Sequence, residues 1–249
     1  MNKLKLICNI LIISFICLMF SCSNGLDCFK KSGKTIIEER QFGYIKSIEL
    51  NDLFDVYLQN DTVDKITIET GENIISKIKT TYSDSSVSIT NTGKCRFAKG
   101  YGNFPKLTIH LKNREQINLQ ISEACNIYTI DTFKIKNFYF INTGDISKCD
   151  ITINVNYLFF LNKYSSGNYV IKGIATNFES EIVGTSFVNA KECKSTFCGI
   201  NSATTGDCYF NVSSKLWVSI HSSGNIYYKG DPDIEIIKKE STGKIIKIY

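Results

Sequence analysis

The sequence is poor in proline, histidine and tryptophan, and no long apolar run follows residue 21. It has two prolines, two histidines and one tryptophan in 249 residues. His110 and His221 have no partner at a metal-ligand spacing, and no Cys-x-x-Cys occurs, so we expect no metal site. Gly-x-Ser-x-Gly is absent, and neither Cys95 nor Cys198 has a histidine partner that the sequence supports. The common signatures of metal-dependent and nucleophilic catalysis are therefore missing, and we expect neither a cofactor nor enzyme activity.

A strong charge of one sign is also missing. The formal charge is +5, and it falls to +3 when Lys3 and Lys5 leave with the leader described below. Acidic residues are interspersed among the basic ones, so the composition does not indicate a nucleic-acid partner.

The first 22 residues have the pattern of a bacterial lipoprotein leader. A basic start precedes an apolar run from Leu6 to Phe20, and the small Ser21 stands just before Cys22. This run is too short for a spanning helix and is typical of a secretory signal. We predict cleavage before Cys22 and acylation of its thiol, which would tether the chain to a membrane. The alternative is plain secretion with a chance cysteine at this position.

The leader predicts three segments and a place in the cell envelope. They are a signal peptide over residues 1–21, a lipid-anchored tether over 22–34 and one domain over 35–249. Ser23, in place of an aspartate after Cys22, favours delivery to the outer membrane. Display on the cell surface is left open, because residues 24–27 contain no strong acidic export tag.

The ten cysteines have different expected roles, because Cys8 and Cys17 leave with the leader and Cys22 takes the lipid. The seven that remain are an odd number, so at least one stays free or pairs between chains. We expect most of the last five to act as small apolar core residues, with any pairing among them undetermined. These five are Cys125, Cys149, Cys193, Cys198 and Cys208.

Short segments with a period of two predict half-buried strands. Apolar residues alternate with polar ones in 44–50, 54–58, 65–69, 87–89 and 107–111. The spacing of Ile74, Ile75 and Ile78 instead predicts one or two helical turns within 72–79, and Ser83-Asp84-Ser85 predicts a turn.

A small residue between polar neighbours recurs through the second half of the chain. The separations are 20, 23, 17, 22, 18 and 19, so the mean is near 20. This period predicts an all-β, parallel β-solenoid of one domain, with coils of about 20 residues. The rival is a β-sandwich, in which turns recur every 8–12 residues or so. We expect each small residue to mark a corner where glycine adopts a positive φ. They are Ala124, Gly144, Gly167, Gly184, Gly206, Gly224 and Gly243.

Acidic residues near these corners are the only candidates for a catalytic pair. Asp145 and Asp207 follow corner glycines that are three corners apart, which places them about 14 Å apart at the spacing of stacked strands. A two-carboxylate mechanism needs about 5–9.5 Å. Asp150, Glu179 and Glu181 are further candidates. We expect the acids mainly to satisfy backbone groups at turns.

Clustered aromatics and corner asparagines are the candidates for a binding face. Alternate members of a strand point outward, so some rings should be exposed, where they could stack on a glycan or bury against a protein. The alternatives are aromatic stacking inside the core for the rings and turn capping for the asparagines. The candidates are Tyr139, Tyr157, Phe159, Tyr227, Tyr228, Asn168 and Asn225.

Several motifs in order resemble the head GIN domain family of auto-transporter adhesins, in the version found on lipoproteins of Bacteroidetes-like bacteria. They are Cys28-Phe-Lys-Lys-Ser-Gly-Lys34, the segment from Arg40 to Leu58, Glu69 to Ile78, Ile89-Thr-Asn91 running into Cys95 to Tyr101, Ser223 to Pro232, and Ser241-Thr-Gly243. The resemblance covers about residues 28–249.

The resemblance implies a right-handed β-helix at the cell envelope with a role in adhesion, and it brings no catalytic residues. It also implies a disulfide between Cys28 and Cys95, worth about 4 kcal/mol in the chain-entropy model, and the alternative is two unpaired thiols. We therefore expect a lipid-anchored, non-enzymatic binding protein with a glycan or protein ligand. Two alternatives are a carbohydrate-active enzyme and a structural envelope protein that self-associates as a homo-oligomer.

Overall fold

The computed structural model describes residues 32–93, 104–145 and 148–249, and it is nearly all β, with 69% of residues in strands and 2% in helix. The predicted leader, Cys22, Cys28 and Cys95 lie outside the described residues. None of the helices in the described ranges has the length and apolar character needed to cross a membrane. The elements, in chain order, are β1 (Thr35–Gln41), β2 (Ser47–Leu50), β3 (Phe54–Asn60), β4 (Lys65–Gly71), α2 (Glu72–Ile75), β5 (Ile78–Ser83), β6 (Ser86–Asn91), β7 (Lys106–Leu111), β8 (Gln116–Ile121), β9 (Cys125–Thr129), β10 (Phe133–Lys134), β11 (Asn137–Asn142), β12 (Lys148–Ser165), β13 (Asn168–Gly184), β14 (Phe187–Thr204), β15 (Cys208–Ile220), β16 (Ile226–Lys229), β17 (Asp233–Lys239) and β18 (Ile245–Lys247).

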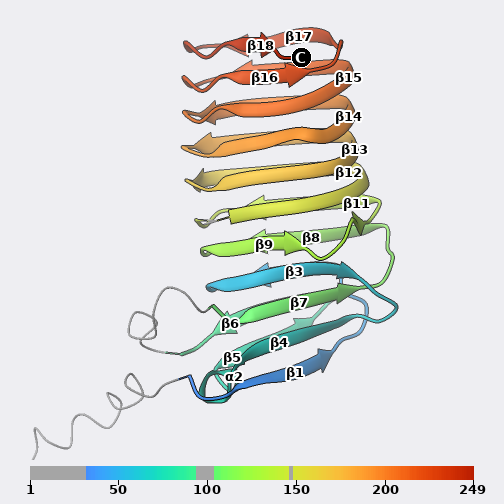
Figure 1. The fold of residues 1–249 in the computed structure, drawn as a ribbon, viewed down its shortest axis with the longest axis vertical. Helices are drawn as coiled ribbons and strands as arrows, with labels where there is room; N and C mark the ends of the chain where they lie inside the picture. The colour runs from blue at the N-terminus through green and yellow to red at the C-terminus, as the bar shows by residue number, and fades with distance from the viewer. Residues whose placement is uncertain (1–31, 94–103, 146–147) are drawn as a thin grey trace, which may run out of the picture.

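The coils stack into a solenoid of about six turns, about 20 residues apart (Figure 1). Asn137 pairs in parallel with Tyr157, Tyr157 with Asn177 and Asn177 with Phe197, a step of 20 residues each time. The following steps, to Lys215 and then to Asp233, are 18 residues. From β8 onward all pairings among the described strands are parallel, which confirms the predicted solenoid and excludes the sandwich.

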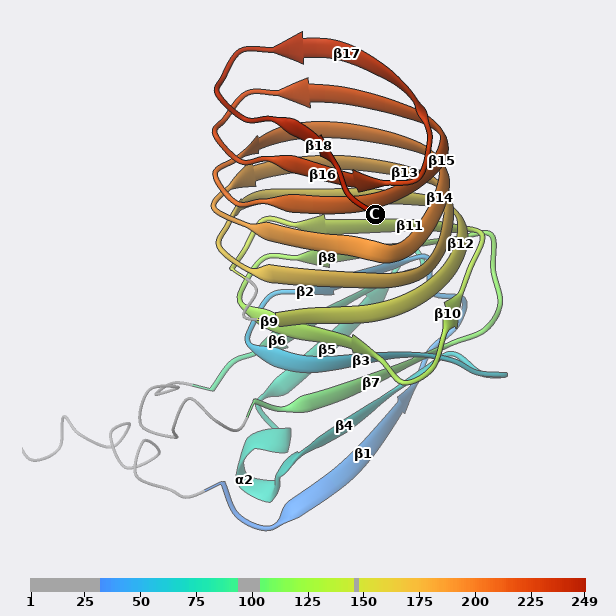
Figure 2. The same ribbon diagram turned by 45° about the horizontal axis from the view of Figure 1, so that its top comes forward.

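Each long strand bends once and contributes to two sides of the solenoid (Figure 2). One side consists of β8, β11, the second halves of β12–β15 and β17, and its outer surface is called the Trp217 face. The other side consists of β3, β9, the first halves of β12–β15, β16 and β18, and its outer surface is called the Tyr227 face.

The N-terminal end departs from the parallel pattern. β4 pairs antiparallel with both β1 and β7, and β5 and β6 form an antiparallel hairpin. The hairpin turns at Asp84 and Ser85, both at positive φ, where a turn is predicted. The predicted helical turn is α2, which packs Ile75 into the core. These elements lie below the stacked coils in Figure 1.

The corner glycines recur as predicted, but the expected reason for them is wrong. Of the corner glycines, only Gly184 has a positive φ. Two other glycines also have a positive φ: Gly173 within β13 and Gly230 just after β16. Most corners instead lack room for a Cβ. One at Gly206 would lie 2.1 Å from the carbonyl oxygen of Ser186, and one at Gly224 would lie 2.3 Å from that of Gly206. Close approach of the backbones of stacked coils therefore selects glycine here.

The core is built from inward-pointing residues that stack from coil to coil. One such column runs Phe138, Leu158, Phe178, Cys198 and Leu216, all fully or almost fully buried. The five described cysteines are free and buried, as expected of small apolar core residues. Burial raises the pKa of the thiols of Cys125, Cys193 and Cys208 to about 12, so they remain protonated.

A buried polar network crosses the coils near the corners. Asn162 accepts hydrogen bonds from Asn142 Nδ2 at 2.9 Å and from the Tyr169 hydroxyl at 2.5 Å, and it donates to Ser186 Oγ at 2.6 Å. Asn142, Asn162 and Ser186 are fully buried. The network ties successive coils together beside the glycines that let them approach.

Candidate binding surface on the Trp217 face

One row of outward side chains runs along the solenoid through successive coils of the Trp217 face. The parallel register aligns Tyr139 with Phe159, Phe159 with Glu179, Glu179 with Gly199 and Gly199 with Trp217. Side chains alternate between the two surfaces of a strand, so these residues all point away from the core. The row brings two aromatic groups to one surface with a glycine between them.

The first aromatic group consists of Tyr139, Tyr157 and Phe159. The ring of Tyr139 lies 5.6 Å from that of Tyr157 and 6.2 Å from that of Phe159, in tilted contacts. The Tyr157 hydroxyl donates a 2.8 Å hydrogen bond to Glu179. Burial, as the larger cause, and this bond to a carboxylate, as the next, both raise the pKa of Tyr157. The phenol therefore remains protonated and can donate. All three rings are half-buried.

The second aromatic group consists of Trp217 and Phe197, and contacts on several sides fix the indole. The Phe197 ring stacks at 6.3 Å with an interplanar angle of 24°, and Lys215 Nζ lies 5.1 Å from the indole centroid. The indole Nε1 donates a 3.1 Å hydrogen bond to Glu235. The hydrogen bond and charge of Lys215 lower the pKa of Glu235, which keeps this acceptor ionised.

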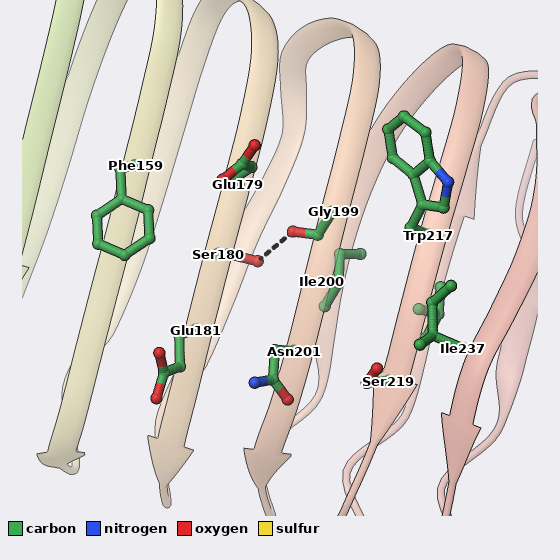
Figure 3. Close-up of a pocket in the computed structure, with 11 residues that line it drawn as sticks. Phe159, Glu179, Ser180, Glu181, Gly199, Ile200, Asn201, Trp217, Ser219 and Ile237 are labelled. Carbon is green, nitrogen blue, oxygen red and sulfur yellow. Dashed lines mark hydrogen bonds between the residues drawn. The ribbon is translucent and has the colours of Figure 1, made fainter.

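Between the two groups lies a hollow of about 320 Å³ centred on Gly199, called the Gly199 hollow (Figure 3). Its volume is at the small end of those found for ligand pockets. Glu179 and Trp217 flank the glycine in the same row. Glu181, Asn201 and Ser219 align in the neighbouring outward row. The hollow is lined by Phe159, Glu179, Ser180, Glu181, Gly199, Ile200, Asn201, Trp217, Val218, Ser219 and Ile237.

Several polar groups at the hollow are free to bind a ligand. Within residues 32–93, 104–145 and 148–249, no hydrogen-bond or ion-pair partner contacts the side chain of Glu181, Asn201 or Ser219. Glu179 accepts only the bond from Tyr157 within the same ranges. The hollow therefore offers carboxylate, amide and hydroxyl groups next to aromatic rings.

The tyrosines predicted near the end of the chain lie on the other side of the solenoid. Tyr227 stacks on Tyr209 on the Tyr227 face, with ring centroids 4.6 Å apart and an interplanar angle of 9°. Tyr228 pairs with the buried Phe210 and packs against the core, so it does not extend that surface. The predicted candidates are thus divided between two opposite surfaces and the core.

The two predicted asparagines lie at corners, away from the Gly199 hollow. Asn225 donates to Asp207 through both its backbone N and its Nδ2, at 3.0 and 3.1 Å, and accepts from the backbone N of Lys244. It bonds groups on the coils before and after its own, which matches the turn-capping alternative. Asn168 begins β13 and is exposed.

The acidic residues predicted as catalytic candidates also lie at different places on the solenoid. Asp207 satisfies the corner groups of Asn225, and Asp150 pairs with Lys172 at 2.8 Å on the Tyr227 side. Asp145 is an exposed corner residue. Only Glu179 and Glu181 lie together, two positions apart on the outward side of β13.

Trp217 and Phe197 are the residues that sequence reasoning missed. Tyr139, Tyr157 and Phe159 stand in an obvious aromatic cluster, whereas Phe197 and Trp217 are isolated in the sequence. The signal that could have found them is the coil length: Phe197 follows Tyr157 by two steps of 20 residues, in the same outward row.

Comparisons with known proteins agree with this architecture. The family described as "Putative auto-transporter adhesin, head GIN domain" matches residues 45–232. A "putative adhesin" of Bacteroides fragilis is similar in structure at 19% identity with a TM-score of 0.69, over 86% of this chain and 97% of that one. One from Parabacteroides merdae gives 14% and 0.61, over 88% and 98%. A "putative lipid binding protein" of Parabacteroides distasonis gives 17% and 0.54, over 87% and 98%. No curated protein matches this chain.

Proposed function

The chain belongs to the head GIN domain family, and we propose that it is a lipid-anchored binding protein of the cell envelope whose contact surface is the Trp217 face. The observation that carries this proposal is the pair of partly exposed aromatic groups on either side of the Gly199 hollow. Aromatic rings with one side exposed are common anchors at binding surfaces. A non-enzymatic binding role also agrees with the family description.

A binding screen tests the contact surface. The full chain, purified in a detergent without a sugar headgroup, is applied to an array of glycans and extracellular-matrix proteins. We expect at least one ligand, and we expect the double variant Tyr139→Ala/Trp217→Ala to lose most of the binding. The matched control is Tyr209→Ala/Tyr227→Ala, which removes a stacked aromatic pair from the Tyr227 face and should bind normally. Equal losses in the two variants would contradict the choice of face.

The anchor is tested separately in cells. Metabolic labelling with a fatty acid should mark the wild-type chain, and Cys22→Ser should abolish the label and release the chain from the membrane fraction. Protease treatment of intact cells then reports whether the domain is displayed outside. If the wild-type chain is not labelled, the protein is secreted without a lipid and is not a lipoprotein.

Glu179 and Glu181 give one observation in favour of a carbohydrate-active enzyme. Two residues apart on one strand, their backbones are separated by about 7 Å, within the range for a carboxylate pair. The two side chains, however, leave the same surface of the same strand, and Glu179 is exposed. A general acid needs an environment that excludes water and keeps it protonated. Release of reducing ends from a glycan that binds would support the enzyme and overturn the proposal.

A further inference from the structure

We propose that the Gly199 hollow is a carbohydrate subsite, which binds an uncharged pyranose unit of a glycan with Trp217 as its stacking platform. This inference rests on the proposed function, because it names the ligand class for the same surface. It is carried by the glycine itself, by the fixed indole and by the polar groups beside them that have spare hydrogen-bonding capacity.

The fold does not require glycine at position 199. A Cβ there would meet only Glu179 Cγ, at 3.7 Å, which is an ordinary van der Waals contact. The residue lies inside β14, where glycine lowers strand stability because it has no side chain to pack and loses more backbone entropy on folding. At the corners, by contrast, a Cβ on Gly144, Gly206, Gly224 or Gly243 would have a backbone atom at 2.1–2.5 Å. What the glycine does provide is an open surface for a ligand in the middle of the outward row.

The indole is held in place before any ligand arrives. Phe197, Lys215 and Glu235 contact it, and the ionised Glu235 carboxylate fixes the direction of the Nε1–H group. A rigid aromatic side chain loses little conformational entropy when a ligand stacks on it. The apolar C–H surface of a pyranose is the complement of such a ring, and the hydroxyl groups at its edge need hydrogen-bonding partners.

Those partners line the hollow. The carboxylates of Glu179 and Glu181 accept hydrogen bonds, Asn201 both donates and accepts, and the Ser219 hydroxyl does the same. These are the side chains that the described structure leaves with spare hydrogen-bonding capacity. Hydroxyl groups spaced around a small ring match such a set better than an extended peptide does, because a peptide needs backbone partners along a free strand edge.

The charges around the hollow further restrict the class of sugar that can bind. Lys215 and Lys238 are already paired with Glu235 and Glu240, at 3.1 and 2.7 Å. No cation in the described ranges forms an ion pair with Glu179 or Glu181, so the hollow is locally acidic. Uronic acids and sulfated sugars would place like charges against these carboxylates, whereas neutral or N-acetylated sugars would not.

The positions of the two aromatic groups also indicate how a longer oligosaccharide would lie on the face. Phe159 and Trp217 are three coils apart in one row, which is about 14 Å at the spacing of stacked strands. An oligosaccharide that ran along the solenoid axis would contact both groups and cross the Gly199 hollow between them. Affinity should therefore rise with the number of sugar units.

The test uses the fluorescence of the full chain, because Trp217 is its only tryptophan. Neutral oligosaccharides of glucose, mannose and N-acetylglucosamine are titrated against the protein, with oligogalacturonate and heparin fragments as anionic comparisons. We expect at least one neutral series to change the emission, with affinity that increases with length, and the anionic sugars to have no effect. Gly199→Val, which places a branched side chain in the hollow, should reduce that affinity at least tenfold while the melting temperature is unchanged or higher. Asn189→Val, at an outward position on the Tyr227 side, is the matched control and should bind as the wild type does.

In the sugar titrations, three results would overturn the inference. They are the absence of binding by any neutral sugar, equal binding by anionic sugars, and undiminished binding by Gly199→Val. A protein ligand that requires Trp217 but tolerates Gly199→Val would reject the sugar subsite and leave the proposed contact face intact. The absence of any ligand on the array, in contrast, would reject both.

Discussion

Glycine occurs in two settings in the solenoid: in the corner stack, formed by Gly206, Gly224 and Gly243, and at Gly199 on the Trp217 face. At the corners, the carbonyl of one coil occupies the space where a Cβ of the next would lie, at 2.1–2.4 Å. On the Trp217 face, Gly199 has ordinary contacts and an open surface beside it. Residues at the corners are thus selected by how closely the coils stack, whereas residues on the face are selected by what the surface presents.

Alanine variants at the two kinds of glycine should differ widely in the free energy of unfolding. Gly206→Ala must push apart two coils that the rest of the structure holds together, and we expect a loss of about 3 kcal/mol or more in the free energy of unfolding. Gly199→Ala meets no such contact, and the alanine restricts the unfolded chain, so we expect a change within about 0.5 kcal/mol or a small gain. Urea denaturation followed by circular dichroism measures both.

Similar losses in the two variants would contradict the assignment of different roles to the two glycines. A large loss in Gly199→Ala alone would mean that the fold itself requires the hollow.

Two asparagines, Asn162 near the corners and Asn201 on the Trp217 face, should show the same difference in stability with smaller changes. Asn162→Ala removes three buried hydrogen bonds, one each from Asn142, Tyr169 and Ser186, so we expect a loss of about 2–3 kcal/mol. Asn201→Ala changes a side chain with no partner in the described structure, and its effect on stability should stay within about 0.5 kcal/mol. The same denaturation experiment tests both, and a destabilised Asn201→Ala would show that the face also supports the fold.

The sequence was sufficient to predict the solenoid, because spacing records the coil length directly. The recurrence of small residues every 20 or so positions follows from stacking, and the alternation in 54–58 and 107–111 follows from one buried side per strand. The antiparallel pairing of β4 with β1 and β7 could not be read from the same pattern, because alternation does not record strand direction.

The candidate site was only half predictable, for a related reason. Tyr139, Tyr157 and Phe159 belong to dense aromatic clusters, but Trp217 joins the same face only through the register, which steps by 18 residues at the last coils in place of 20. The function of Gly199 was invisible, since a glycine that the fold requires and one that it does not require look identical in a sequence. Only the space around the backbone separates them.

The smallest expected effect is a pH-dependent change at Trp217 that leaves the fold intact. The hydrogen bond and charge of Lys215 lower the pKa of Glu235, so the carboxylate is ionised at neutral pH and accepts the indole N–H. Because the pKa is lower in the folded chain than in the unfolded one, the interaction is fully present above the ordinary glutamate value of about 4.3 and is lost as the pH falls through the folded value. We expect one reversible step in tryptophan emission on the acid side of the ordinary glutamate value, with an unchanged circular dichroism spectrum.

Variants decide whether Glu235 is the source of that step, because the hollow beside the indole holds two further carboxyl groups, those of Glu179 and Glu181. Glu235→Gln should remove the step, since the amide does not titrate. Lys215→Met should move it to higher pH, because Glu235 then loses the cation that favours its ionised form. Glu181→Gln, on the neighbouring row, should leave the step in place. A step that survives in Glu235→Gln and disappears in Glu181→Gln would show that the indole responds to the hollow and not to the ion pair that holds it.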